Sequence, residues 1–208
     1  MSFHLTSLNR EGSPKDCFYI FDSNILLPQL GLPDEDSTYS NYLSFLSKVI
    51  KGSGTEKLPN CKVVISPLQM SEVFNKLLRY HGRIHWEKAG KGVDFNEYYK
   101  GVYRKSDDFK TAYENIKDDF EDILEVSVMV TETKQMTIES LLNFDAKALD
   151  FNDNYLYQLA LETGAILVSH DADFYDLNNL QFATYRTDLY QRFKDSVMVR
   201  AKMKKYTK

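Results

Sequence analysis

The stretch Cys17–Leu27, CFYIFDSNILL, places an aspartate at the end of an otherwise apolar run and follows it at once with Ser23 and Asn24. Such a run is typical of a buried strand, where a carboxylate is costly. Short polar side chains also cap helices, because they bond the free backbone N–H groups at a helix start. Capping alone explains Asp22 unless other carboxylates recur at equivalent places in the chain.

Four further apolar runs predict strands, at residues 61–65, 125–130, 165–169 and 181–185. Most of the runs are continuously hydrophobic rather than alternating, as expected for parallel strands that helices cover on both faces. The segments between them have helical patterns. The sequence therefore predicts an α/β protein, a three-layer α/β/α fold with a mainly parallel five-stranded sheet.

Two of the predicted helices have clear ends. In SPLQMSEVFNKLLRY, Ser66 is the expected N-cap, Pro67 the first helical residue and Gln69 the partner that completes a capping box. NDNYLYQLALETG ends at Gly164, a residue typical of helix C-termini. Each of these helices adjoins a predicted strand.

A chain of 208 residues with 43% hydrophobic content can bury one sizeable core. We therefore expect a single domain over residues 1–208, with a core at 16–186, a helical insert at 80–124 and a C-terminal helix with a basic tail at 187–208. We expect the last few residues, KMKKYTK, to be disordered.

The composition limits which cellular compartment and which partners are expected for this protein. The net charge of -4 gives no global attraction to nucleic acid or anionic lipid, so a polyanion would need a local basic patch. Two cysteines are too few for a disulfide framework, and no segment has the ~18 apolar residues of a membrane span. These features predict a cytoplasmic protein without a membrane partner.

Carboxylates recur where the predicted strands end. Asp22 ends the first run, Glu72 lies near the start of the helix after the second, Asp153 opens the helix before the fourth, and Asp171 and Asp173 follow that run. Parallel strands gather their carboxyl ends at one edge of a sheet. Acidic groups brought together there repel one another unless cations neutralise them.

Hard divalent cations suit such a cluster. Mg²⁺ and Mn²⁺ prefer oxygen ligands and keep several waters. Two such ions about 3.5–4 Å apart can activate water and stabilise the leaving oxygen in phosphodiester hydrolysis. The pattern therefore points to Mg²⁺ or Mn²⁺ as cofactor.

Three blocks of the sequence resemble PIN-domain nucleases. FDSNILL is similar to their opening strand, ISPLQMSEV to their strand, turn and Glu-bearing helix, and DNYLYQLALETGAILVSHDADF to their closing block. The resemblance implies a metal-dependent endoribonuclease acting on single-stranded RNA. In relatives of the VapC type it also implies a toxin with an antitoxin partner, and a homodimer is left open. The long segment between Glu72 and Asp153 departs from compact toxins.

The resemblance carries the family's metal-binding acids onto Asp22, Glu72, Asp153 and Asp171, with Asp173 as a fifth. It carries the small polar residues that hold the acids onto Asn24 and Ser169. Asp150 could take the place of Asp153, but the spacing to Ala160 and Gly164 favours Asp153.

Two other functions remain open. A phosphatase of the haloacid dehalogenase type also begins with an apolar strand and an aspartate, but it needs a second acid where this chain has Asn24. A PIN-like fold could instead serve as a binding or regulatory module without catalysis. A lost carboxylate would indicate that class, and none of the expected acids is missing.

The insert offers two weaker patterns. His81 and His85 have the spacing of a zinc pair, but nothing completes the site and Gly82 is expected to interrupt the helix. Cationic and aromatic residues alternate nearby and could bind RNA, although neighbouring acids and packing of the aromatics on the sheet favour a structural role. The cations are Arg79, Arg83, Lys88, Lys91, Arg104 and Lys105, and the aromatics are Tyr80, Trp86, Tyr98, Tyr99 and Tyr103.

Overall fold

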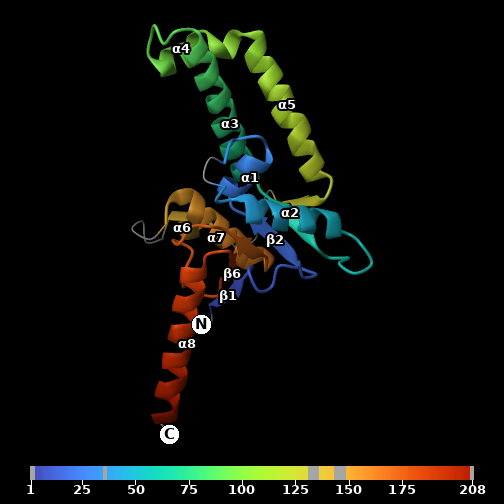
Figure 1. The fold of residues 1–208 in the computed structure, drawn as a ribbon, viewed down its shortest axis with the longest axis vertical. Helices are drawn as coiled ribbons and strands as arrows, with labels where there is room; N and C mark the ends of the chain where they lie inside the picture. Colours follow the sequence, from blue (N-terminus) through green and yellow to red (C-terminus); the bar gives the residue numbers. More distant parts are fainter. Residues whose placement is uncertain (1–2, 35–36, 131–135, 143–148, 207–208) are drawn as a thin grey trace.

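The computed structural model describes residues 3–34, 37–130, 136–142 and 149–206. In this part of the chain a six-stranded, all-parallel sheet has the strand order β1-β6-β5-β2-β3-β4 (Figure 1). The strands are β1 (His4–Ser7), β2 (Phe18–Phe21), β3 (Lys62–Ile65), β4 (Ser127–Met129), β5 (Ile166–Val168) and β6 (Gln181–Thr184). The central strand β2 pairs with β3 on one side and β5 on the other.

Helices lie in the connections from β2 to β3, from β3 to β4 and from β4 to β5, and one helix follows β6. They are α1 (Ser23–Gln29), α2 (Ser40–Gly52), α3 (Pro67–Lys88), α4 (Phe95–Gly101), α5 (Asp107–Leu124), α6 (Ile138–Leu142), α7 (Phe151–Thr163) and α8 (Thr187–Tyr206), with a 3-10 turn η1 (Tyr103–Lys105). No described helix is long and apolar enough to cross a membrane.

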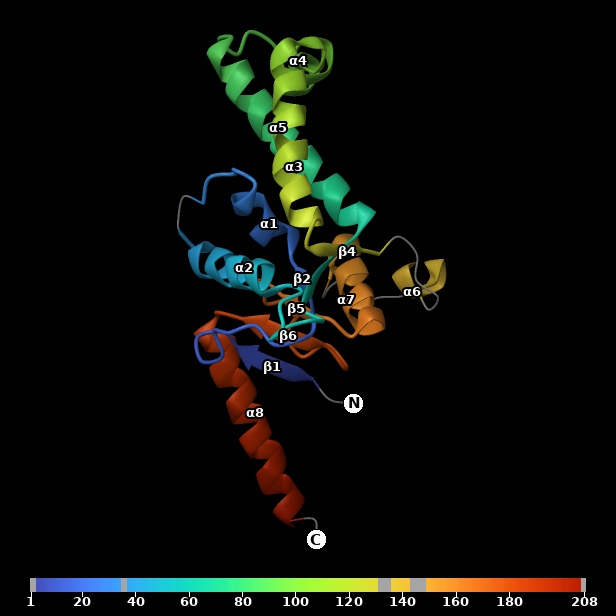
Figure 2. The ribbon, with the colours of Figure 1, turned by 90° about the vertical axis from the view of Figure 1, so that its right-hand side faces the viewer.

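The sheet separates two hydrophobic cores, which makes the fold three-layered (Figure 2). Tyr19 and Phe21 of β2 pack on one face with side chains of α1, α2, α3 and α5. Ile20, between them in sequence, packs on the other face with α7 and the start of α8. Successive side chains of a strand point to opposite faces, so a strand covered on both sides must be apolar throughout.

The predicted α/β fold with a mainly parallel sheet is confirmed, but the strand number is six rather than five. The missed strand is β1, which pairs in parallel with β6 at the sheet edge, His4 opposite Gln181. Its sequence, HLTS, contains one core residue, Leu5. An edge strand needs few apolar side chains, so it leaves little hydrophobic pattern.

The predicted insert forms a helical arm, which we define as residues 79–124, projecting away from the sheet (Figures 1 and 2). The expectation that Gly82 interrupts the helix is wrong, because α3 runs unbroken to Lys88. The aromatics were also expected on the sheet. Instead Phe95, Tyr99 and Tyr103 form a separate cluster within the arm.

At the opposite end of the molecule, α8 extends away from the sheet (Figure 1). Leu189 in its first turn is buried in the second core. The helix continues to Tyr206, so most of the segment expected to be a disordered tail is helical, and its last two residues lie outside the described part of the chain.

Gly82 lets α4 approach α3 closely. A Cβ at this position would lie 2.7 Å from Cδ2 of Tyr99 and 2.9 Å from Cδ1 of Tyr103. We expect Gly82→Ala to destabilise the arm by about 1–3 kcal/mol, the usual effect of overpacking a well-packed contact. Thermal unfolding followed by near-ultraviolet circular dichroism would report the loss, because the disturbed rings are tyrosines.

Gly101 supplies the matched control. It also lies in a helix of the arm, but a Cβ there meets nothing within 4 Å. Gly101→Ala should leave the melting temperature unchanged or raise it slightly. Equal melting curves for wild type and Gly82→Ala would contradict the close approach.

Candidate active site

Asp22 lies at the carboxyl end of β2, where it is also the N-cap of α1. Its carboxylate accepts hydrogen bonds from the Asn24 N–H at 2.9 Å and from Ser169 Oγ at 2.6 Å. The residue is 5% exposed, and this burial raises the pKa of its carboxyl group, while the bonds from Ser169 and Asn24 partly oppose the rise. Asp22 therefore caps a helix and also supplies a buried acid.

Glu72 lies in the second turn of α3, half-buried beside α1. Ser23 Oγ donates to its Oε2 at 2.8 Å, and Lys76 Nζ forms an ion pair with Oε1 at 2.7 Å. The bond from Ser23 orients the carboxylate toward the start of α1. Ser23 was not predicted as a site residue, although it directly follows Asp22 in the sequence.

The start of α3 is tied to the end of β2. Ser66 is the N-cap, as predicted, and its Oγ accepts from the Gln69 N–H at 3.2 Å. The predicted capping box is not formed, because the Gln69 side-chain amide instead donates to the carbonyl oxygen of Phe21. This bond fixes α3 directly beside the residue that precedes Asp22.

Asp153 and Asp150 divide their roles at the start of α7. Asp150 is the N-cap, and its Oδ1 accepts from the Asp153 N–H at 2.9 Å. Asp153, in the first turn of the helix, has its pKa raised to about 7, first by burial and then by the charges of Asp150, Asp22 and Asp171. The helix thus places Asp153 toward Asp22 and keeps Asp150 as the exposed cap.

The loop after β5 supplies the remaining acids. Ser169 Oγ accepts from the Asp171 N–H at 2.9 Å while it donates to Asp22, so one hydroxyl joins the two residues. The Asp173 N–H donates to Asp171 Oδ1 at 2.9 Å. Asp173 itself is exposed, and it is joined to this group through its backbone N–H.

The structure brings Glu72, Asp153 and Asp171 within electrostatic reach of Asp22. The charges of Asp171 and Glu72 raise the pKa of Asp22. Among the described ion pairs, none joins a lysine or arginine to Asp22, Asp153 or Asp171. Three of the four acids therefore repel one another without a paired base.

The acids are gathered loosely rather than packed around a point. In the described ranges, no three His, Cys, Asp or Glu side chains form a group that could hold a metal ion by themselves. The chemistry of the donors is nevertheless that of hard cations, which accept water for the rest of their shell. A divalent ion of this type fits the donor set if waters complete its coordination.

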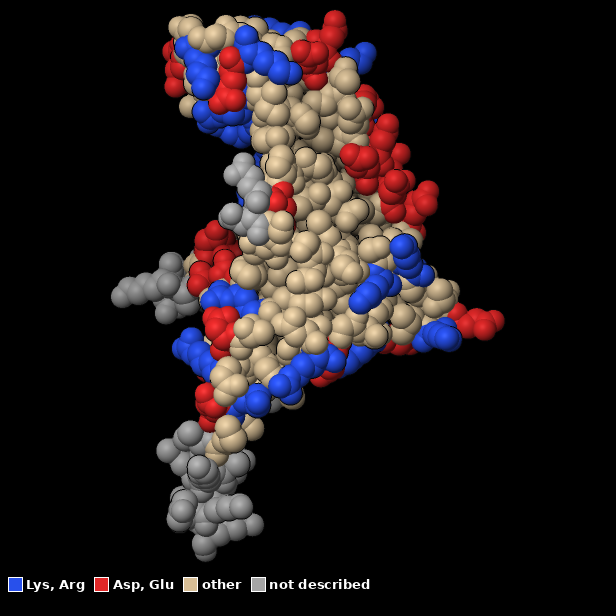
Figure 3. All heavy atoms as spheres, in the orientation of Figure 1, with Lys and Arg blue, Asp and Glu red and all other residues tan. Residues whose placement is uncertain are grey.

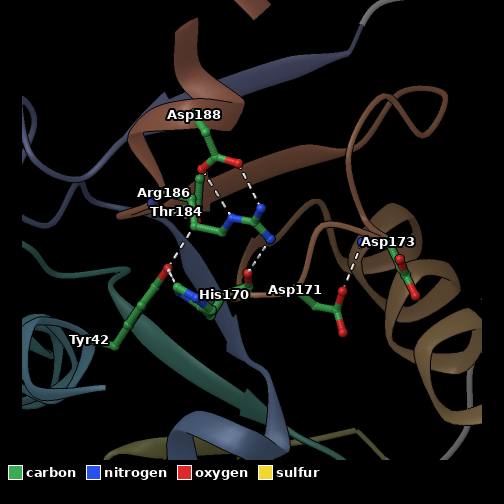
Figure 4. A network of polar contacts seen from close by, with 7 residues as sticks. All are labelled: Tyr42, His170, Asp171, Asp173, Thr184, Arg186 and Asp188. Carbon is green, nitrogen blue, oxygen red and sulfur yellow. Dashed lines mark hydrogen bonds and ion pairs between the residues drawn. The ribbon is translucent and has the colours of Figure 1, made fainter. Parts of the chain in front are cut away.

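A polar network missed from the sequence anchors the Asp171 loop (Figure 4). The Tyr42 hydroxyl lies 3.2 Å from His170 Nδ1 and 2.9 Å from Thr184 Oγ1. Arg186 forms an ion pair with Asp188 at 2.7 Å and donates to the His170 carbonyl oxygen at 3.5 Å. Burial and the charge of Arg186 lower the pKa of His170, so its imidazole is neutral at neutral pH.

A signal for this network was present in the sequence. Thr184 ends β6 and Arg186 follows it, just as Asp22 follows β2 and Ser169 follows β5. Polar residues after each central strand end mark the same edge of the sheet. Tyr42 gave no such signal, because it lies in the middle of the amphipathic helix α2.

Comparisons with known proteins give similar solved structures, among them the following two. One is PAE2754 from Pyrobaculum aerophilum, with 17% sequence identity, a TM-score of 0.45 and coverage of 89% of this chain and 94% of that one. The other is VapBC2 from Rickettsia felis bound to a DNA fragment from its promoter, with 19% identity, a TM-score of 0.43 and coverage of 81% and 99%.

Neither family models nor curated proteins extend this likeness. No protein-family model matches the chain, and no curated protein matches it either. The role of the acidic site therefore rests on the chain's own side chains.

The raised pKa of Asp153 has a consequence for stability. Its folded-state value of about 7 lies above its ordinary value of 3.8, so the fold favours the protonated acid, and this stabilisation is lost as the pH rises from about 4 to about 7. In chelator-treated protein at about pH 8, Asp153→Asn should therefore melt at a higher temperature than wild type, and the difference should shrink toward about pH 4.

Asp118→Asn is the control for this measurement, because Asp118 is an exposed acid on α5 far along the sequence from the site. It should change the melting temperature little at either pH. A stabilisation by Asp153→Asn that is the same at both ends of the pH range would show that titration of Asp153 is not its cause.

Proposed function

We propose that this chain is an endoribonuclease that hydrolyses RNA phosphodiesters at the Asp22 site with Mg²⁺ or Mn²⁺. The observation that carries the proposal is the gathering of Asp22, Glu72, Asp153 and Asp171 from four separate segments. In the described ranges, only Glu72 forms an ion pair with a lysine or arginine. Stability alone disfavours such a group, since like charges raise one another's pKa. Perturbed acids at the strand ends of a parallel sheet favour a functional site.

The neighbouring side chains fix the acids in place. Ser169 holds Asp22 and the backbone of Asp171, and Ser23 holds Glu72. Asp150 caps α7 and so sets the position of Asp153 at its start. These bonds supply the orientation that a site needs before a substrate binds.

One or two of these carboxylates would hold the divalent ion, together with water and an oxygen of the scissile phosphate. When bound, such an ion activates water and stabilises the charge that develops on the phosphate. Mg²⁺ usually binds through one or two carboxylates and a substrate phosphate, which suits a loosely gathered group. Asp173 is exposed and accessible as an auxiliary ligand.

Side-chain nucleophiles are poorly placed to replace water in this reaction. Cys61 is fully buried, and burial raises the pKa of its thiol to about 11. Burial also raises the pKa of Cys17. Both thiols therefore stay protonated at neutral pH, in the less reactive form.

The two alternative functions, a phosphatase and a non-catalytic binding module, fit the site less well. A phosphatase of the haloacid dehalogenase type needs an acid at residue 24, whereas the Asn24 side-chain oxygen accepts from Lys76 Nζ at 3.4 Å. A non-catalytic binding module has no need of four acids held against one another. The assay below separates this module from an enzyme.

The toxin role and the antitoxin partner implied by the resemblance stay predictions. Growth arrest on induced expression, relieved by Asp22→Ala, would support the toxin role. Copurification of a small protein encoded beside this chain would support the antitoxin. The same purification would report whether the chain forms a homodimer.

The nuclease proposal makes a direct prediction about cleavage. Purified protein with Mg²⁺ or Mn²⁺ should cut single-stranded RNA and leave 5′-phosphate and 3′-hydroxyl ends. Asp22→Ala or Asp153→Ala should lower the rate by about 100-fold or more, because each removes several kcal/mol of transition-state stabilisation. Asp118→Asn should keep the wild-type rate. Cleavage that persists in EDTA, or that survives both alanine substitutions, would overturn the proposal.

The ion should also stabilise the protein. A ligand that binds only the folded state raises the melting temperature by mass action. We expect millimolar Mg²⁺ or Mn²⁺ to raise the melting temperature of wild type, and Asp22→Asn to remove most of that gain. Calorimetry with and without the ion measures this effect independently of RNA. A wild-type melting temperature that does not respond to either ion would count against the site.

A further inference from the structure

A stripe of basic residues leads from the acidic site along α3. After Glu72, the helix places Lys76, Arg79 and Arg83 four, seven and eleven residues further on, which is the spacing of one helix face. We call these three residues the basic stripe. All three are exposed, and α3 carries no acid between Glu72 and Glu87.

The guanidinium groups of the two arginines in the stripe lie over aromatic rings. The Arg83 guanidinium carbon lies 4.1 Å from the centroid of the Phe95 ring and 5.4 Å from that of Trp86. The Arg79 carbon lies 5.2 Å from the Phe95 centroid and 5.5 Å from that of Tyr99. Stacked guanidinium groups lose less freedom when they bind a second partner, because their rotamers are already restricted.

No described ion pair neutralises these arginines. Arg79 donates to the Asn96 side-chain oxygen at 3.0 Å, which is an uncharged partner. Of the nearby acids in the described chain, Glu87 pairs with Lys91, and Asp94 caps α4 by accepting from backbone N–H groups. The two positive charges are therefore available to an external anion.

The charges of the arm are distributed unevenly (Figure 3). Acidic side chains follow the outer edge of the arm along α5, and on the side of α3 and α4 basic side chains gather with some acidic ones among them. In a protein of net charge -4, this local gathering of basic side chains is not the consequence of a basic composition. It gives a polyanion a local point of attachment.

We propose that the basic stripe binds single-stranded RNA next to the segment that is cut at the acidic site. The inference rests on the proposed function for the choice of RNA. Eleven residues of helix separate Glu72 from Arg83, about 16 Å at 1.5 Å per residue, so a strand held at the site can also reach the stripe. Guanidinium planes accept unpaired bases by stacking and phosphates by ion pairing, which favours a single strand over a duplex.

RNA binding by the basic stripe also explains why two unpaired arginines lie over the aromatic cluster of the arm. The sequence favoured packing as the purpose of the arm's aromatics, and Phe95 and Tyr99 are indeed buried. Packing alone does not require two unpaired arginines on the exposed side of that cluster. The rings serve both purposes, since they join α4 to α3 and hold the guanidinium groups outward.

The test is RNA binding measured without catalysis. Fluorescence anisotropy in EDTA, with a labelled oligouridine of about 20 nucleotides, separates binding from cleavage. The double variant Arg79→Ala/Arg83→Ala should bind at least about tenfold more weakly. Its salt dependence should also be shallower by about 1.4 in the slope of log K against log salt, because each phosphate contact on a single strand contributes about 0.7.

Two further variants make the result specific. Arg79→Gln/Arg83→Gln keeps long side chains over the rings, so it should show the same loss of affinity even if the alanine variant unfolds the arm. Arg10→Ala is the matched control, since the Arg10 guanidinium carbon also lies over a tyrosine, 5.0 Å from the Tyr190 centroid, but outside the arm. It should bind RNA as wild type does.

Wild-type affinity and salt slope in the glutamine variant would overturn the proposal, as would equal affinity for a duplex. Cleavage kinetics provide a test that is independent of the binding measurements. On long strands the glutamine variant should raise KM and leave kcat unchanged, whereas strands too short to reach Arg79 should be cut as by wild type. Loss of binding with cleavage intact would support the stripe, and binding without any cleavage would refute the nuclease proposal alone.

Discussion

The buried carboxylate of Asp22 is the constraint on which the rest of the site depends. A charge at the end of a central strand is tolerated only if its hydrogen bonds are satisfied, and Ser169 and the Asn24 N–H satisfy them. Ser169 in turn holds the backbone of Asp171, and the neighbouring Phe21 carbonyl holds α3 through Gln69. Requirements at one residue thus determine where three segments meet.

Much of this arrangement could be predicted because its causes are local. Five of the six strands lie within apolar runs, and a central strand such as β2, which is covered on both faces, requires an apolar composition. The acids Asp22, Glu72, Asp153 and Asp171 were predicted to converge because parallel strands share one edge, and their mutual effects on pKa agree with that placement. The convergence was therefore predicted from the sheet topology and not from any single motif.

The parts that could not be predicted depend on distant partners. β1 places only Leu5 in the core, and it is held in the sheet by its parallel pairing with β6. Gln69 has the position of a capping-box residue, but its side-chain amide donates to the Phe21 carbonyl, which lies beside it in the folded chain. Gly82 was expected to break a helix, but instead it makes room for the ring of Tyr99, seventeen residues further along the chain. Each outcome follows from tertiary contacts that a local pattern does not contain.

The continuity of α3 restricts how this protein can evolve. Because one helix carries Glu72 at its base and Arg79 and Arg83 higher up, a single inserted or deleted residue between them would rotate everything beyond it by about 100°. The arginines would then face away from the acids and from the rings of α4. Changes of length should therefore accumulate in the loop between α3 and α4, at residues 89–94, where an insertion alters the tip of the arm without changing the angular phase of the helix.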